Sequence, residues 1–202
     1  MAHNKTKPAS PAARGEPIRQ RVIDAAEHLL RQDKADFSMR DLAAEAGVSF
    51  ATPFNQFGSK AAIMQALSAR RIDEMESRYL SIQPSGDACN RTLVAVDVAV
   101  EVMLEEAVVN RSVMGWLGTP VAVAGTLPRS MALWALALGE GDGLAADRRA
   151  DALSRLPRQL AFTFRGVLSF WTAGELADED LCADARGAAA ALLGSFAEWR
   201  GR

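Results

Sequence analysis

Side chains able to contact a nucleic acid gather between residues 38 and 60. Thr52, Asn55 and Gln56 carry hydrogen-bonding groups, and a Gln side chain can pair with adenine through two hydrogen bonds. Arg40 can reach a guanine or a phosphate, and Lys60, with the amides that open its helix, suits a phosphate. The residues that we expect to contact DNA are Ser38, Arg40, Ser49, Phe50, Ala51, Thr52, Pro53, Asn55, Gln56 and Lys60.

A short helix is expected to open this stretch. Ser38 is suited to cap it, and Asp41 follows three residues later, where its carboxylate can complete a capping box. Leu42 and Ala46 give the helix an apolar stripe. Gly47 is expected to end it, because glycine tolerates the left-handed conformation that follows many helices.

A second short helix and a long third one follow. The second is expected over residues 50–57 with Ser49 as its cap. Gly58 ends it, and Ser59 caps the long helix. Two short helices joined by a glycine-containing turn form a helix-turn-helix, which sets its second helix in the major groove of DNA.

The whole stretch resembles the DNA-binding domain of the tetracycline-repressor (TetR) family. That family carries a run (Ser/Thr)-x-Arg-Asp-(Leu/Ile)-Ala-x-x-Ala-Gly-Val-Ser, which is present here from Ser38 to Ser49. Its recognition helix ends as Phe57-Gly58-Ser59-Lys60 does here, and a helix like residues 19–26 precedes the run. The resemblance covers residues 18–68.

The resemblance implies a ligand-responsive dimeric transcriptional regulator, most often a repressor. Members of the family bind a palindromic operator through the N-terminal domain and an inducer in the C-terminal domain. Two recognition helices must then lie about 34–36 Å apart to enter successive major grooves.

The recognition helix departs from the family pattern at three positions. Pro53 stands where the family usually has Leu or Ile, and proline is tolerated there because the first helical turn has few paired amides. Phe54 replaces a common Tyr and lacks its hydroxyl, and Gln56 replaces a common His or Tyr. We expect Phe54 and Phe57 to hold the helix on the small core.

Composition indicates an all-α protein. The 202 residues carry a net charge of −2, and their abundance of Ala, Leu, Arg and Glu favours helix. Residues 1–60 have nine basic and seven acidic side chains, so their balance is +2, and the remainder has −4. A basic N-terminal segment followed by an acidic remainder suits a protein that contacts phosphates through its N-terminal segment only.

No signal peptide or membrane span is recognisable, which predicts a cytoplasmic protein.

We expect three regions. Residues 1–16 are predicted to be a disordered basic arm, residues 17–68 a three-helix DNA-binding domain, and residues 69–202 a helical domain for effector binding and dimerisation. Helices are predicted over residues 59–83, 89–109, 145–173 and 178–199, with shorter ones between residues 111 and 143.

The C-terminal region holds large apolar side chains that either line an effector pocket or form plain core. With few polar groups among them, they favour a small apolar or aromatic effector. The pocket candidates are Met103, Met114, Trp116, Met131, Trp134, Phe162, Phe164 and Trp171.

The last two predicted helices have more apolar surface than one body can cover. They suggest a homodimer through a four-helix bundle, the alternative being a purely internal bundle. The interface candidates are Leu160, Val167, Ala188, Leu192 and Phe196.

Enzymatic chemistry is not indicated. No His lies beyond His28, and no Ser or Cys has a base partner in a recognisable motif. Glu101, Glu105 and Glu106 lack the His that a di-metal bundle needs, so no metal or other cofactor is expected. Two other hypotheses stay open: a nucleoid- or division-associated DNA-binding protein without an effector, and a carboxylate-based hydrolase.

Overall fold

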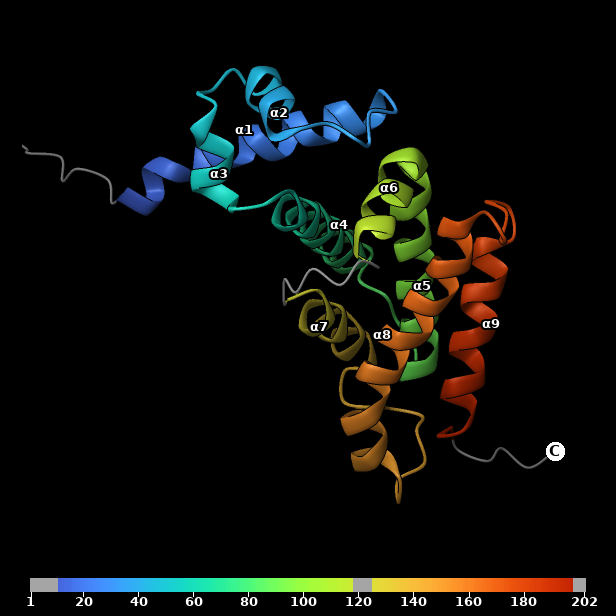
Figure 1. Ribbon diagram of the computed structural model, residues 1–202. Coiled ribbons are helices and arrows are strands. Elements are labelled where there is room, and N and C mark those ends of the chain that lie inside the picture. The colour runs from blue at the N-terminus through green and yellow to red at the C-terminus, as the bar shows by residue number, and fades with distance from the viewer. Residues whose placement is uncertain (1–10, 118–124, 198–202) are drawn as a thin grey trace, which may run out of the picture. The chain divides into compact units, whose positions relative to one another are not determined.

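The structure, a computed structural model, describes residues 11–117 and 125–197, with side-chain surroundings given from residue 16 onward. Contact clustering divides the chain into two units, Met1–Ile63 and Met64–Arg202. The expected all-α class is confirmed, since no strand occurs in the described ranges (Figure 1). The helices are α1 (Pro11–Arg31), α2 (Met39–Glu45), α3 (Ala51–Phe57), α4 (Lys60–Ile82), α5 (Ala88–Glu105), α6 (Ala107–Leu117), α7 (Thr126–Leu138), α8 (Arg149–Ala173) and α9 (Leu181–Gly194).

In the first unit, α2 begins as its sequence predicts. The amide of Asp41 donates to Ser38 Oγ at 3.2 Å, and the amide of Ser38 donates to Asp41 Oδ2 at 2.8 Å. This reciprocal pair is the expected capping box. After the helix, Gly47 has φ 61°, which lets the chain turn sharply into the segment before α3.

The apolar faces of α1 and α2 form the core of this unit. Burying each such side chain stabilises the folded state by about 1.5–3 kcal/mol, so these apolar contacts can hold α1, α2 and α3 together. The buried residues include Val22, Ala26, Leu30, Phe37 and Leu42.

Two boundaries in the first unit differ from the expectation. α1 starts at Pro11, so residues 11–16 are helical where a disordered arm was expected, and Pro17 lies inside the helix. α3 starts at Ala51, and no side chain caps it. Instead of capping, Ser49 Oγ lies 2.8 Å from Thr52 Oγ1, so the two hydroxyls bond to each other.

The second unit is a helical bundle in which α8 packs on α6, α7 and α9, and α5 packs on α7 and α9 (Figure 1). The largest buried side chains lie where these helices meet. They include Val96, Trp134, Leu156, Trp171 and Leu193. None of the described helices combines the length and the apolar character that crossing a membrane requires.

A break after Glu105 divides the predicted helix 89–109 into α5 and α6. The backbone of Glu106 leaves the helical region, with φ −126° and ψ 51°. The amide of the buried Asn110 side chain donates to the carbonyls of Val102 and Met103, at 3.1 and 2.8 Å. These bonds satisfy carbonyls at the end of α5, so the break needs neither Gly nor Pro.

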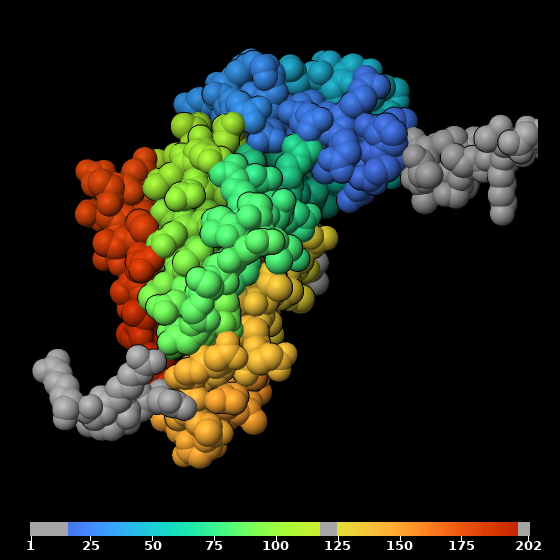
Figure 2. Space-filling view, turned by 180° about the vertical axis from the view of Figure 1, so that it is seen from behind, coloured from blue at the N-terminus to red at the C-terminus, as the bar shows by residue number. Residues whose placement is uncertain are grey.

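α4 belongs to both units, because the division falls between Ile63 and Met64 rather than at the expected residue 68. In the second unit, Arg71 Nε donates to Asn110 Oδ1 at 2.9 Å, and Arg78 pairs with Glu105. Side chains of α4 therefore contact the ends of α5 and α6, which meet the green α4 surface in Figure 2.

Candidate functional site

The exposed face of α3 is dominated by two aromatic rings. Phe50 and Phe54, one helical turn apart, are 55% and 45% exposed, and their ring centroids lie 6.0 Å apart in an edge-to-face arrangement. The guanidinium of Arg40 lies over the Phe50 ring at 5.6 Å. The expectation that Phe54 packs on the core was wrong, since its ring points into solvent.

The other side chains expected at the DNA surface differ in exposure. Ala51 and Asn55 are exposed, whereas Thr52 and Gln56 are half-buried. Ser38 and Ser49 are exposed, but their hydroxyls already bond to Asp41 and Thr52. The outward face of α3 therefore offers rings, one small residue and one amide rather than a row of hydroxyls.

Pro53 is buried and so is not available to contact a base, contrary to the expectation. It is the third residue of α3, where its missing amide has no helical partner to lose. Its fixed φ and buried ring anchor the inner face of the helix.

Lys60 is also turned inward, although a phosphate contact was expected. Its ammonium donates to the carbonyls of Ala35 and Phe37, at 2.8 and 2.7 Å, and lies 4.0 Å from the centroid of the Phe37 ring. Burial lowers the pKa of this ammonium. The side chain ties the start of α4 to the segment before α2, which is a structural role.

Two arginines of α1 hold the helix-turn-helix in place. Arg19 donates to the carbonyl of Gln56 at 2.8 Å and stacks on Phe57, with 4.2 Å from its guanidinium carbon to the ring centroid. Arg21 donates to the carbonyl of Ala46 at 2.7 Å. Both carbonyls end short helices, where no intrahelical donor is available.

The pocket candidates of the second unit are dispersed. Met103, Met114, Trp134 and Trp171 are buried core, and Trp116, Met131 and Phe164 are half-buried. Trp134 and Phe164 form an edge-to-face pair at 5.4 Å. Phe162 does not belong with them, because it is 51% exposed on the outer face of α8, with Arg158 stacked over its ring.

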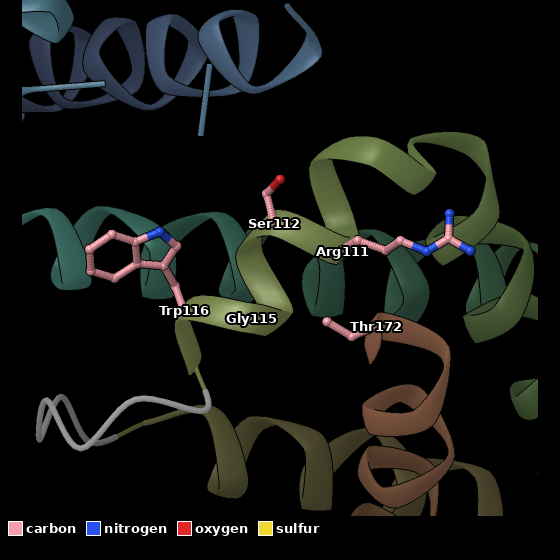
Figure 3. A pocket seen from close by; sticks show the side chains of 5 residues that line it. All are labelled: Arg111, Ser112, Gly115, Trp116 and Thr172. Atoms are coloured by element: carbon pink, nitrogen blue, oxygen red, sulfur yellow. The ribbon is translucent and has the colours of Figure 1, made fainter. Parts of the chain in front are cut away.

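A pocket of about 420 Å³ lies between α6 and α8 (Figure 3). Of the sequence candidates only Trp116 lines it, together with Arg111, Ser112, Gly115 and Thr172. The side chains of Trp116 and Arg111 extend toward opposite ends (Figure 3). The volume lies in the range of small-molecule sites, but the pocket is largely open to solvent.

Arg111 lines the pocket but was not among the candidates of the sequence analysis. Its guanidinium donates to Asp178 at 2.5 Å and stacks on Trp171 at 4.4 Å. The indole of Trp171 donates to the same carboxylate oxygen at 2.7 Å. Arg111 follows Asn110 and stands one helical turn before Gly115 in the sequence. This position is the signal that could have drawn attention to Arg111.

The interface candidates also divide by burial. Leu160 and Phe196 are 2% and 7% exposed and belong to the interior of the bundle instead of its surface. Val167, Ala188 and Leu192 are half-buried. The exposed apolar side chains of α8 are Phe162 and Phe170, the latter 58% exposed.

Comparison with known proteins agrees with the geometry of the first unit. Residues 22–67 match the sequence profile of the bacterial regulatory proteins of the TetR family. This segment contains α2, α3 and the turn between them. None of the curated proteins searched matches the chain.

Solved structures share the fold of nearly the whole chain. A TetR transcriptional regulator from a Rhodococcus species is 18% identical, with a TM-score of 0.70 over 90% of this chain and 97% of that one. A protein from Mesorhizobium loti assigned to the TetR transcriptional regulators is 18% identical, with a TM-score of 0.55 over 94% of this chain and 100% of that one. Residues 22–67 therefore carry a DNA-binding domain of the TetR type, and the chain as a whole has the fold of these solved regulators.

Proposed function

We propose that this protein is a dimeric, ligand-responsive transcriptional repressor that leaves a palindromic operator when it binds a small apolar or aromatic effector. The observation that carries the DNA-binding part is the outward face of α3. Phe50, Phe54 and Asn55 are exposed there while Pro53 is buried. Apolar side chains such as Phe can contact thymine methyl groups, and Asn can pair with adenine.

The exposed surface of α8 and α9 supports the dimer. Phe162 and Phe170 lie two turns apart on α8, and the exposed residues of α9 include Gly187, Ala190 and Gly194. An added Cβ at Gly187 or Gly194 would meet nothing within 4 Å. Small residues allow close helix approach, and the two rings supply apolar surface for a four-helix bundle with a second copy.

A hydrogen-bond relay supports the response to an effector. Asn110 joins the end of α5 to Arg71 of α4, and its neighbour Arg111 lines the pocket. A molecule that moves α6 would pull on α4, whose first residues, Lys60–Ile63, belong to the DNA-binding unit. Coupling of this kind is reciprocal, so operator DNA must weaken effector binding by the same factor.

The test is a selection of bound sequences from random duplex DNA, followed by binding to the selected and scrambled duplexes across a salt series. A regulator should enrich a two-fold symmetric sequence and prefer it at every salt concentration. Equal, weak binding to both duplexes would refute the proposal. The alternative of a nucleoid- or division-associated protein predicts many scattered genomic sites and no effector response.

The absence of enzymatic activity and the cytoplasmic location remain predictions. Members of this family act on DNA, which supports both. Incubation with candidate esters and other hydrolysable compounds, with product formation as the readout, would test the first.

A further inference from the structure

We propose that the effector is an apolar molecule with a carboxylate group, and that Arg165, at the edge of the α6–α8 pocket, binds this carboxylate. The inference rests on the proposed ligand response and adds the chemical class of the ligand. It depends on three observations: the partners of Arg165, its place beside the pocket, and the distribution of charge over the helices.

Arg165 is a half-buried cation with weak partners. Its guanidinium nitrogens lie 3.1 Å from the sulfur and 3.2 Å from the carbonyl oxygen of Met114. No ion pair joins it to a carboxylate of any described residue, and the segment 118–124 contains no acidic residue. Burial lowers the pKa of this guanidinium, which nevertheless stays charged. A partly buried charge without a counter-ion is unfavourable.

Arg165 is not one of the five lining residues, but it bonds to the residue that precedes one of them. The Met114 carbonyl that accepts its hydrogen bond is linked directly to the amide of Gly115, which lines the pocket. On α8, Arg165 and the lining residue Thr172 are seven residues apart and so share one helix face. A ligand seated along the pocket, whose lining residues appear in Figure 3, can therefore place an anionic group within reach of the guanidinium.

The helices around the pocket are strongly cationic. α6 and α8, which line the pocket, contain five arginines and one carboxylate, Asp151, a balance of +4, and one of these arginines, Arg111, is paired with Asp178. Asp151 forms its ion pair with Arg155, so it is not the counter-ion of Arg165. α5 and α9 contain two arginines and four carboxylates, a balance of −2. A local positive potential of this kind attracts an anionic ligand.

The remaining pocket contacts define the body of the ligand. The indole of Trp116 offers an aromatic surface. The hydroxyls of Ser112 and Thr172 donate to carbonyls of their own helices, at 3.0 and 2.7 Å. The second cation of the lining, Arg111, is already paired with Asp178. A monocarboxylate with an apolar or aromatic body fits this arrangement better than a di-anion.

The test uses the full-length protein and two pairs of compounds, in each of which the ester replaces the negative charge of the acid by a methyl group: octanoate with methyl octanoate, and 3-phenylpropanoate with its methyl ester. Binding is measured by titration calorimetry. We expect at least one acid to bind about tenfold more tightly than its ester, because hydrogen bonds to a charged partner contribute that much. Arg165→Gln should abolish this preference, and Arg165→Lys should keep most of it.

Arg155→Gln is the control, because it removes one positive charge from the exposed surface of the same helix. It should leave the preference for the acid unchanged. Binding of no acid, equal binding of acid and ester, or a preference that survives Arg165→Gln would overturn the inference. A preference that Arg155→Gln also abolishes would overturn it too, since net charge would then be sufficient. DNA binding by the unaltered protein tests the proposed regulatory function separately. Retained binding to the selected DNA in Arg165→Gln then shows that the variant is folded.

Discussion

Each unit exposes a pair of phenylalanines that lie close together in the sequence. In each pair, an arginine lies over one of the two rings. In the N-terminal unit these are Phe50 and Phe54, with Arg40 at 5.6 Å from the Phe50 ring. In the C-terminal unit they are Phe162 and Phe170, with Arg158 at 5.1 Å from the Phe162 ring. Exposed rings alone would indicate an apolar partner in both cases.

The surroundings of the two pairs distinguish their partners. α3 is two turns long and stands clear of neighbours on its outer face, beside the exposed amide of Asn55, as a helix that enters a DNA groove must. α8 is 25 residues long and packs beside the small exposed residues of α9. We therefore expect the same residue type to contact bases in the N-terminal unit and to pack against another helix in the C-terminal unit.

The largest expected effect is on the dimer. Phe162→Asp together with Phe170→Asp should place two charges in the proposed α8–α9 interface, where each desolvated charge is strongly unfavourable. We expect monomers in sedimentation analysis at concentrations where the unaltered protein is dimeric. Leu80→Asp, at an equally exposed apolar position of α4, should leave the dimer intact. A dimer that persists in the double variant would place the interface elsewhere.

The second effect is on the scaffold that holds α3. Lys60→Met should lower the free energy of unfolding of the N-terminal unit by about 1–2 kcal/mol, because two partly buried carbonyls lose a charged donor. Denaturant unfolding measures this, and Lys34→Met, at an exposed position, is the control. The salt dependence of DNA binding should keep its slope. A slope reduced by about one unit would show that Lys60 contacts a phosphate after all.

The third effect separates the two aromatic pairs. Phe54→Ala and Phe50→Ala should each weaken binding to the selected DNA by about tenfold and relax base preference, because a contact to a thymine methyl group is lost. Deoxyuridine in place of thymine removes only the methyl group. It should weaken binding of the unaltered protein and have no effect on the variant that lacks the matching ring. Equal sensitivity of both proteins to deoxyuridine would exclude the methyl contact.

The smallest effect is at the cap of α2. Hydrogen bonds from the amide and hydroxyl of Ser38 lower the pKa of Asp41. A carboxyl whose pKa is lower in the folded state stabilises the fold above its ordinary pKa of about 4, and this contribution disappears as the pH falls through the lowered value. Thermal unfolding of Asp41→Asn should therefore differ from the unaltered protein at neutral pH and converge with it in acid.

Local signals made much of the N-terminal unit predictable. The cap at Ser38, the turn at Gly47 and the cap at Ser59 depend on residues within a few positions of one another. The helix-turn-helix could be recognised for that reason. The side chain of Lys60 could not be placed, since its partners Ala35 and Phe37 lie more than 20 residues away. The exposure of Phe54 depends on which face of α3 packs on α1 and α2.

The C-terminal unit was predictable as helix but not as a site. The break at Glu106 has no Gly or Pro to signal it and depends on Asn110 reaching back to α5. Trp199, expected at the end of the last helix, lies outside the described residues. Arg165 had one sequence signal, an isolated cation in the apolar run from Phe162 to Leu168, but nothing in the chain order indicates that Met114 is its neighbour.

The sequence by itself therefore determined the all-α class and the helix-turn-helix, because helix periodicity and capping are set by residues one or two turns apart. Only the tertiary structure decided which cations are tied to backbone carbonyls, which rings face outward, and where a pocket opens between α6 and α8. These features depend on which helices pack together, and that packing is a property of the whole core rather than of any short segment.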